Sequence, residues 1–149
     1  MFIGEFTHTL DDKKRLSLPS KFRKELGKKV IITHGLDNCL FMFTVSQWGK
    51  MAEQLGSMSF ANADSRGFNR IMLGGAVEVE IDTAGRILIP DFLREYAGVN
   101  LDKKNNRLVF TGVHTRIEIW EETRWKSYKE KILKQADSLA AKLSSIGAI

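Results

Sequence analysis

The sequence predicts an α+β fold in which one β-rich unit occurs twice. The segment Asp11–Pro19 returns 71 residues later (82 − 11) as Asp82–Pro90, with its aspartate, arginine and proline in the same places. Alternating apolar and polar residues flank both segments, as in half-buried strands, and apolar residues at helical spacing follow them. We interpret this pattern as an internal duplication. Flanking residues keep the same offset: Gly4 with Gly75, Arg23 with Arg94, and Gly27 with Gly98.

Length and composition are those of an ordinary globular protein. The chain has 149 residues, of which 43% are hydrophobic. One copy alone is too small to bury a stable core, so we expect the two copies to share a core or to lean on neighbouring subunits. The single cysteine, Cys39, excludes an intramolecular disulfide, and no segment resembles a signal peptide or a membrane span. We therefore expect a cytoplasmic protein.

Positive charge is concentrated in the first copy. The formal net charge is +5 and the sequence pI is near 9.4, which permits an anionic partner without demanding one. Between Lys13 and Lys29, eight basic residues stand against one acidic residue, Glu25, whereas the equivalent stretch Ala84–Asn100 has no net charge. The first copy is therefore the stronger candidate for contact with nucleic acid.

The elements of the first copy follow from its periodicity. Phe2–Leu10 and Arg15–Leu18 alternate as strands do, so Asp11–Lys14 must be a turn. Aspartate favours such turns because its side chain accepts hydrogen bonds from the backbone amides that follow it. Pro19 ends the second strand. The remaining predicted elements are a short helix at Lys21–Leu26 with Ser20 as its N-cap, strands at Val30–Thr33 and Leu40–Phe43, and a helix at Ser46–Leu55.

A small, polar connector at Gly56–Ala63 and a helix from about Asp64 precede the second copy, with Phe68, Ile71 and Met72 on one face of that helix. The second copy predicts strands Ala76–Ile81 and Arg86–Ile89 around the turn Asp82–Gly85, helix Asp91–Ala97, strands Arg107–Thr111 and Arg116–Trp120, and a final helix Thr123–Leu143 with an apolar stripe. These elements divide the chain into repeat 1 (1–56), a connecting helix (57–73), repeat 2 (74–122) and a C-terminal helix (123–149).

These motifs resemble the MraZ family of bacterial transcription regulators, which are built from two tandem SpoVT-AbrB-like units. The resemblance rests on both Asp-x-x-x-Arg segments, on Leu73–Ala76 and on Ile117–Trp120, and it covers nearly the whole chain. It implies an internally duplicated, swapped-hairpin (double-psi-like) β-barrel with flanking helices that assembles into a homo-oligomeric, octamer-like ring. It also implies a nucleoid-associated regulator that binds short direct repeats in the promoter of the cell-division and cell-wall gene cluster.

One position departs from the family pattern. The residue before the arginine of the first turn is often glycine in the family, as Gly85 is in the second copy, but here it is Lys14. If this position has a positive φ, lysine costs about 1 kcal/mol relative to glycine. The lysine also adds a cation to the tip of the turn.

The candidate site consists of basic side chains on and near the two turns. In the functional interpretation they approach double-stranded DNA, where an arginine can bond phosphate oxygens or a guanine edge. Because the second turn lacks lysines, we hypothesise that copy one binds DNA and copy two mainly builds the ring. In the alternative interpretation, each Asp-x-x-x-Arg is only a structural clasp. The predicted DNA-binding residues are Lys13, Lys14, Arg15, Lys21, Arg23 and Arg86, with Asp11 and Asp82 as loop supports.

Other chemistry is not indicated. His8, His34 and His114 lack metal-ligand spacing, and Cys39 lacks a nucleophile signature, so we expect no metal, no cofactor, no small-molecule substrate and no enzymatic activity. The main alternative function is an antitoxin-like protein-interaction module, because AbrB-type barrels also occur in antitoxins. Those proteins usually carry one barrel and a disordered tail, whereas this chain has two copies and an amphipathic tail. We also expect Trp48 and Trp125 to anchor their helices to the core. We expect Arg66 and Arg70 to lie on a solvated helix face rather than to contact DNA or an adjacent subunit.

Overall fold

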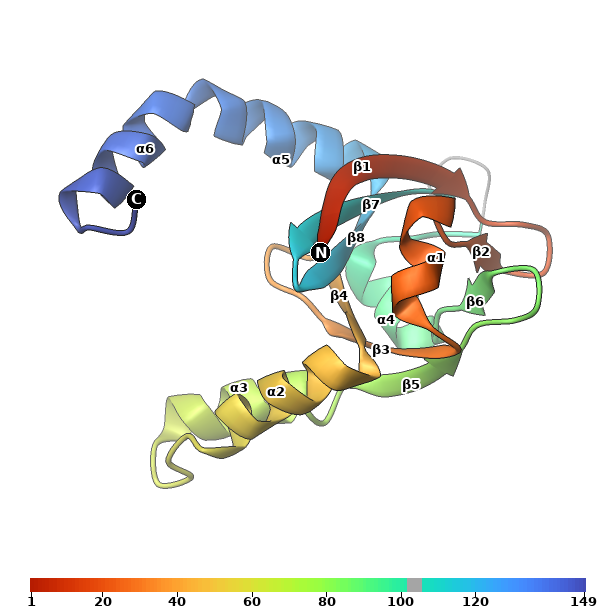
Figure 1. Cartoon of the computed structure of the whole chain (residues 1–149), viewed down its shortest axis with the longest axis horizontal. Coiled ribbons are helices and arrows are strands. Elements are labelled where there is room, and N and C mark those ends of the chain that lie inside the picture. Colours follow the sequence, from red (N-terminus) through yellow and green to blue (C-terminus); the bar gives the residue numbers. More distant parts are fainter. Residues whose placement is uncertain (102–105) are drawn as a thin grey trace.

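The computed structural model describes residues 1–101 and 106–149, and the same series of elements occurs in it twice (Figure 1). The first series is β1 (Phe2–Thr9), β2 (Arg15–Ser17), α1 (Ser20–Leu26), β3 (Lys29–His34), β4 (Leu40–Thr44), α2 (Val45–Gly56) and α3 (Ala63–Met72). The second is β5 (Val77–Glu80), β6 (Arg86–Leu88), α4 (Asp91–Ala97), β7 (Arg107–His114), β8 (Arg116–Glu121), α5 (Glu122–Lys134) and α6 (Ala136–Ser145). The α+β class is confirmed.

Six strands form one antiparallel sheet in the order β1-β7-β8-β4-β3-β5. Strands of the two series pair with each other in it, because β1 pairs with β7, β4 with β8, and β3 with β5. Neither series has a sheet of its own, so the two copies share a core, as expected for units of this size. The domain boundaries drawn from the sequence stay a prediction.

This sheet is not closed, so the barrel that the family resemblance implied is not confirmed. Its edge strands, β1 and β5, do not pair with each other in the described residues, and each continues through a tight turn into β2 or β6. Within the part of the chain that the structure describes, these two short strands pair only with one another, as a two-stranded antiparallel ribbon. Pro19 and Pro90 follow the ribbon closely, and because proline donates no backbone hydrogen bond, the pairing of β2 with β6 ends before them. The swapped-hairpin interpretation of the ribbon stays a prediction.

The ribbon packs into the core through one of its two sides. Leu16 and Ile87, at its centre, are 0% and 1% exposed and belong to the same apolar cluster as Phe22 of α1 and Leu93 of α4. A second apolar cluster, around Trp120, lies under α2, α3 and α5. In Figure 1 the ribbon and its turns lie at the right, whereas α2–α3 and α5–α6 extend to the left.

Three helix ends differ from the sequence-based predictions. Ser20 is the first residue of α1, and Pro19 holds the N-cap position without a side-chain bond. The N-cap of α2 is Thr44, whose hydroxyl accepts a hydrogen bond of 3.1 Å from the amide of Gln47. The predicted final helix is divided into α5 and α6 at Gln135, because φ is −104° and ψ is 3° there, outside the helical range.

Two predicted apolar helix faces are only partly covered. In α3, Met72 is buried, but Phe68 and Ile71 are 37% and 52% exposed. In the last two helices, Trp125 packs against the second apolar cluster, whereas Leu143 is 42% exposed. These helices therefore carry apolar surface that the rest of the chain does not cover. Within the described residues, the helices are too short or too polar to cross a membrane.

Candidate nucleic-acid interface

The turn Asp11–Lys14 between β1 and β2, here called loop 1, is held by the side chain of its first residue. Oδ1 of Asp11 accepts hydrogen bonds of 2.9 Å from the amides of Lys13 and Arg15, and Oδ2 accepts one of 2.8 Å from Nε of Arg15. The amide of Asp11 donates to the carbonyl oxygen of Arg15 at 2.9 Å, which closes the turn. One carboxylate therefore positions both the loop backbone and the guanidinium group.

The turn Asp82–Gly85 between β5 and β6, here called loop 2, has the same geometry. Oδ1 of Asp82 accepts hydrogen bonds of 2.9 Å from the amides of Ala84 and Arg86, and Oδ2 accepts one of 2.8 Å from Nε of Arg86. The amide of Asp82 donates to the carbonyl oxygen of Arg86 at 2.9 Å. The repeated sequence motif is thus also a repeated hydrogen-bonding pattern, in which each aspartate clasps its loop and its arginine.

The residue before each arginine has a left-handed backbone. Its φ is 65° at Lys14 and 76° at Gly85. Lys14 therefore does have a positive φ, the conformation that favours glycine. The surroundings of the two positions differ. A Cβ atom on Gly85 would lie 2.6 Å from the guanidinium carbon of Arg23, whereas Lys14 lines a hollow together with Asp91, Arg94 and Glu95. Loop 1 therefore has space for its lysine.

The two loop arginines lie close together although they come from different copies. β2 and β6 pair so that Arg15 is opposite Leu88 and Arg86 is opposite Ser17. Strand alternation puts these four side chains, here called the ribbon face, on one side of the ribbon and the buried central pair on the other. Nη1 of Arg86 lies 3.9 Å from Oδ2 of Asp11, the oxygen that also holds Arg15. The two loops therefore meet at one carboxylate.

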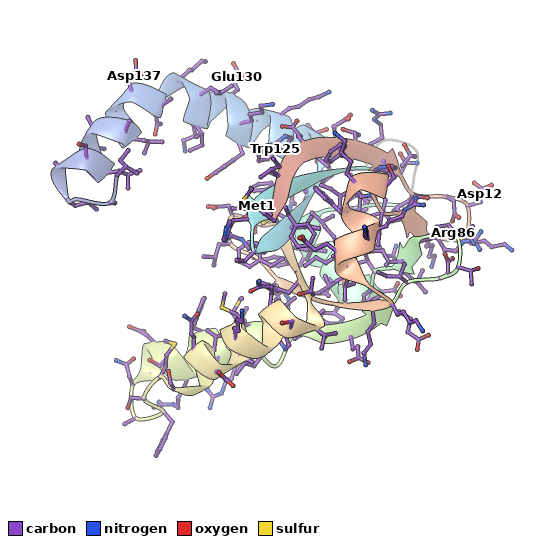
Figure 2. All side chains as sticks on the ribbon, in the orientation of Figure 1. Met1, Asp12, Arg86, Trp125, Glu130 and Asp137 are labelled. Carbon is purple, nitrogen blue, oxygen red and sulfur yellow. The ribbon has the colours of Figure 1, made fainter. Side chains whose placement is uncertain are left out.

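The arginines and the tip of loop 1 are accessible to a partner. The side chains of Arg15 and Arg86 are 32% and 30% exposed, and Lys13 and Lys14 are exposed. Figure 2 shows Asp12 of loop 1 and Arg86 at the same end of the molecule, opposite the end at which α5 and α6 project. Both loops and the ribbon face thus form one surface.

Lys21 and Arg23, the two other predicted DNA-binding cations, lie on α1 rather than on the ribbon. Nε of Arg23 donates a hydrogen bond of 2.9 Å to the carbonyl oxygen of Leu18, and its guanidinium group covers Gly85 of loop 2. Nζ of Lys21 lies 5.9 Å from the ring centroid of Phe6 in β1. Arg23 therefore borders the ribbon surface, whereas Lys21 lies over β1.

Two side chains of the ribbon face were not singled out from the sequence. Ser17 and Leu88 alternate with buried residues of their strands, so strand periodicity is the signal that could have found them. They add a hydroxyl group and an apolar group to the two guanidinium groups.

Hydrogen bonding lowers the pKa of both loop aspartates below the ordinary value for aspartate. The largest cause is the backbone N–H of Arg15 for Asp11 and that of Arg86 for Asp82, and the side chain of the same arginine lowers the pKa further. Both carboxylates are therefore ionised at neutral pH, which keeps the loops in their hydrogen-bonded form.

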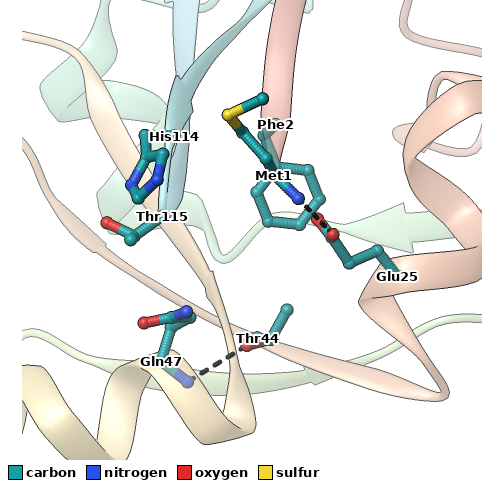
Figure 3. Close-up of a pocket in the computed structure, with 7 residues that line it drawn as sticks. All are labelled: Met1, Phe2, Glu25, Thr44, Gln47, His114 and Thr115. Carbon is teal, nitrogen blue, oxygen red and sulfur yellow. Dashed lines mark hydrogen bonds and ion pairs between the residues drawn. The ribbon is translucent and has the colours of Figure 1, made fainter.

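The pocket in Figure 3, at the start of β1, is lined by groups that serve the fold. The N-terminal amino group of Met1 pairs with Glu25 of α1, which ties the first strand to the helix beside it. Thr44 and Gln47, on the opposite wall, form the N-cap of α2. Four of the seven residues that line this pocket therefore have structural roles.

His8, His34 and the cysteine also have structural surroundings. Among the described residues, no group of three or more His, Cys, Asp or Glu side chains could hold a metal ion. His8 packs against Phe110 and His34 against Tyr96. Cys39 is buried, and burial raises the pKa of its thiol, which makes it a poor nucleophile.

The tryptophans pack as expected, and the arginines of the middle helix are exposed in the chain. Trp48 and Trp125 pack against the second apolar cluster from α2 and α5. Arg66 and Arg70 are exposed on α3, and Nη1 of Arg66 donates to the carbonyl oxygen of Phe60 at 3.0 Å. That they face solvent rather than DNA or another subunit stays a prediction.

Comparison with known proteins identifies close relatives over the whole chain. A family model described as "MraZ protein, putative antitoxin-like" matches twice, at residues 1–71 and 72–145, with the same offset as the repeated motif. A protein of Moorella thermoacetica is 49% identical over 143 residues, 96% of each chain. Proteins of Acetivibrio thermocellus and Clostridium tetani are 45% and 43% identical over 147 residues, 99% of each chain. All three are named transcriptional regulator MraZ.

Proposed function

The chain belongs to the MraZ family, and we propose that it regulates transcription by binding double-stranded DNA sequence-specifically through its ribbon face. The names of its relatives support a role in transcription regulation, and the family is one of regulators rather than enzymes. The observation that carries the proposal is the convergence of Arg15 and Arg86, each held by an aspartate, on one side of the ribbon.

Each of these arginines is prepared to bind an anion. A guanidinium group has five N–H donors, and the one on Nε donates to the aspartate of the same loop. The remaining donors suit phosphate oxygens, or O6 and N7 of a guanine. Because the aspartate already orders the side chain, less conformational entropy is lost when DNA binds. Lys13 and Lys14 add two exposed charges for phosphate contacts beside Arg15.

The position of Arg86 favours a contribution from both copies. The hypothesis drawn from the sequence gave copy two mainly a role in assembly, because loop 2 has no lysine. Nη1 of Arg86 is, however, 3.9 Å from the carboxylate that holds Arg15, so a DNA backbone that meets one arginine passes close to the other. We therefore propose that both arginines contact DNA, with loop 1 supplying the larger part of the electrostatic attraction.

Self-assembly into an octamer-like homo-oligomeric ring completes the proposal. Apolar side chains near the C-terminus are exposed and support self-association; they are Leu133, Leu143, Ile146 and Ile149. Several modest sites on one ring gain avidity when the DNA repeats match their spacing. We propose that such a ring acts in the cytoplasm, at the nucleoid, on short direct repeats in the promoter of the cell-division and cell-wall gene cluster.

The words "putative antitoxin-like" in the family description support a second candidate, a protein-interaction module. An antitoxin of this type binds its partner through a tail that becomes ordered on binding. Here the tail already forms α5 and α6 in the chain alone. This difference favours the DNA-binding regulator.

The deciding experiment measures DNA binding by fluorescence anisotropy at several salt concentrations. The ligands are the DNA upstream of the protein's own gene and a scrambled fragment, and the proteins are wild type, Arg15→Ala, Arg86→Ala and Arg70→Ala. Arg70 is the matched control, because it is an exposed arginine on α3. Size-exclusion chromatography with light scattering checks that assembly is unchanged.

We expect the wild type and Arg70→Ala to prefer the upstream fragment, and both loop variants to bind it about tenfold or more weakly. The logarithm of the affinity should fall with the logarithm of salt by about 0.9 per phosphate neutralised. An unaffected Arg86→Ala would return copy two to a purely assembling role. If the folded and assembled wild type binds neither fragment at physiological salt, the regulator proposal is wrong and the interaction module takes its place.

A further inference from the structure

Leu88 is an apolar side chain on a charged surface. It is 54% exposed, whereas the other apolar residues of the ribbon, Leu16 and Ile87, are 0% and 1% exposed. Its exposure means that it adds little to the core of the chain. It lies directly opposite Arg15 in the ribbon, beside the residues to which the proposed function assigns DNA contact, and the inference drawn from it rests on that function.

The two copies differ at this position. The offset that relates Arg15 to Arg86 also relates Ser17 to Leu88, so the arginines repeat across the ribbon while the other two side chains do not. The loop tips differ as well, because loop 1 carries two lysines and loop 2 has none. A surface with two different halves fits a DNA site in one direction only. The site read by one chain is therefore not a palindrome.

The exposed face of the ribbon has a length that suits the major groove. This groove is about 12 Å wide and admits a two-stranded β-ribbon. The three residue pairs of β2 and β6 span about 7–10 Å, the length of two or three base pairs. In the major groove, thymine presents an apolar group, its 5-methyl, which apolar side chains contact. Leu88 is the apolar member of the ribbon face.

We propose that Leu88 determines base specificity by packing against the 5-methyl group of a thymine, while the hydroxyl group of Ser17 bonds the edge of a nearby base. The two arginines hold the ribbon in the groove through phosphate or guanine contacts. Another subunit is a poorer partner for this surface than DNA is. Covering Leu88 with protein would also desolvate the guanidinium groups of Arg15 and Arg86 beside it, whereas DNA supplies anions for both.

The test compares thymine DNA with uracil DNA, which differ only in the 5-methyl group. The upstream fragment is prepared in both forms, and binding is measured with the full-length wild type, Leu88→Ala, Leu88→Ser and Leu36→Ala. Leu36 is a matched control because it is 55% exposed and lies outside the ribbon. Leu88→Ser gives the second copy the residue that the first has at the equivalent position. Circular dichroism and size-exclusion chromatography check folding and assembly.

We expect the wild type and Leu36→Ala to bind uracil DNA about three- to fivefold more weakly than thymine DNA, the effect of losing one buried methyl group. Both Leu88 variants should bind thymine DNA more weakly than the wild type does and should no longer discriminate between the two forms. A preference for thymine that survives in both variants comes from DNA shape and overturns the proposal. Equal wild-type affinity for the two forms overturns it while leaving the regulator proposal intact.

Two other results are equally informative. If both Leu88 variants fail to assemble while Leu36→Ala assembles, Leu88 belongs to a subunit interface and its assignment to DNA is wrong. If the wild type binds neither form, the proposed function itself fails and the role of Leu88 in it falls too.

Discussion

Lys14 has the same left-handed backbone as Gly85, with a φ of 65° against 76°, although glycine alone adopts this conformation without steric cost. The hydrogen bonds from the arginine of each loop to its aspartate side chain have the same lengths in both loops, 2.9 Å from the backbone amide and 2.8 Å from Nε. The geometry of the loop is therefore set by the aspartate and its amide partners, and it does not require glycine before the arginine.

Replacing Lys14 by glycine should stabilise the protein. Lys14→Gly relieves the left-handed strain, worth about 1 kcal/mol, and leaves the bonds to Asp11 in place. Urea unfolding at neutral pH measures the change in the free energy of unfolding. The variant should also show a shallower dependence of DNA affinity on salt, because a loop cation is lost. A lower stability for Lys14→Gly would mean that the freedom glycine adds to the unfolded chain outweighs the relieved strain.

The reciprocal change in loop 2 should have the opposite sign. Gly85→Lys introduces the strain and places a Cβ atom against the guanidinium group of Arg23. That group is the end of a flexible side chain and can move, but it then loses its hydrogen bond to the carbonyl oxygen of Leu18. We expect a loss of about 1–2 kcal/mol in the same urea assay. An unchanged stability would show that loop 2 tolerates a side chain as readily as loop 1 does.

Acid should weaken the two loops through their aspartates. Folding lowers the pKa of Asp11 and Asp82, so each carboxylate binds its proton less readily in the folded chain than in the unfolded one. Their stabilising effect is therefore complete above the ordinary aspartate pKa of about 3.9, and it is lost as the pH falls through the lowered values.

The variant Asp11→Asn/Asp82→Asn isolates this effect. We expect the urea midpoint of the wild type to fall more steeply than that of the double variant as the pH drops below about 4. Asp137→Asn, on the exposed α6, is the control and should follow the wild type. Identical pH dependence in the wild type and the double variant would show that the loop carboxylates do not contribute.

The sequence predicted the structure of each loop but not that the two loops lie close together. Asp11 and Arg15 are close in sequence, and the turn between two alternating segments is a local signal, so the pairing within each loop could be read from the residues. The proximity of Arg86 to Asp11 depends on the pairing of β2 with β6, which joins distant parts of the chain. The division of the last helix at Gln135 was missed because neither glycine nor proline marks it.

Cys39 should report global unfolding. Its side chain is 0% exposed, and burial, with a smaller effect of Glu118, raises the pKa of its thiol. In the native state, labelling by iodoacetamide should therefore be about a thousandfold or more slower than in concentrated guanidinium chloride, since it needs an unfolding event. Mass spectrometry measures the labelled fraction over time. Comparable rates in the two conditions would mean that the second apolar cluster opens locally.

Gly75→Ala should destabilise the protein because the added methyl group collides with its neighbours, whereas Gly67→Ala should not. Gly75 is buried, and a Cβ atom there would meet the ring of His34 and lie 2.6 Å from the carbonyl oxygen of Ile71. Movement of the His34 ring is restricted because its centroid lies 4.7 Å from that of the Tyr96 ring. The carbonyl group of Ile71 belongs to the backbone of α3. We expect a loss of about 1–3 kcal/mol, the usual cost of overpacking.

Gly67 is the matched control because a Cβ atom on it meets nothing within 4 Å and it lies inside α3. Alanine is the better helix former, so Gly67→Ala should gain about 0.5–1 kcal/mol in the same urea measurement. The opposite signs separate the two effects of one methyl group, since both variants reduce the entropy of the unfolded chain similarly. A stabilising Gly75→Ala would show that His34 and α3 can part, and that the junction between the copies is less tightly packed than these contacts require.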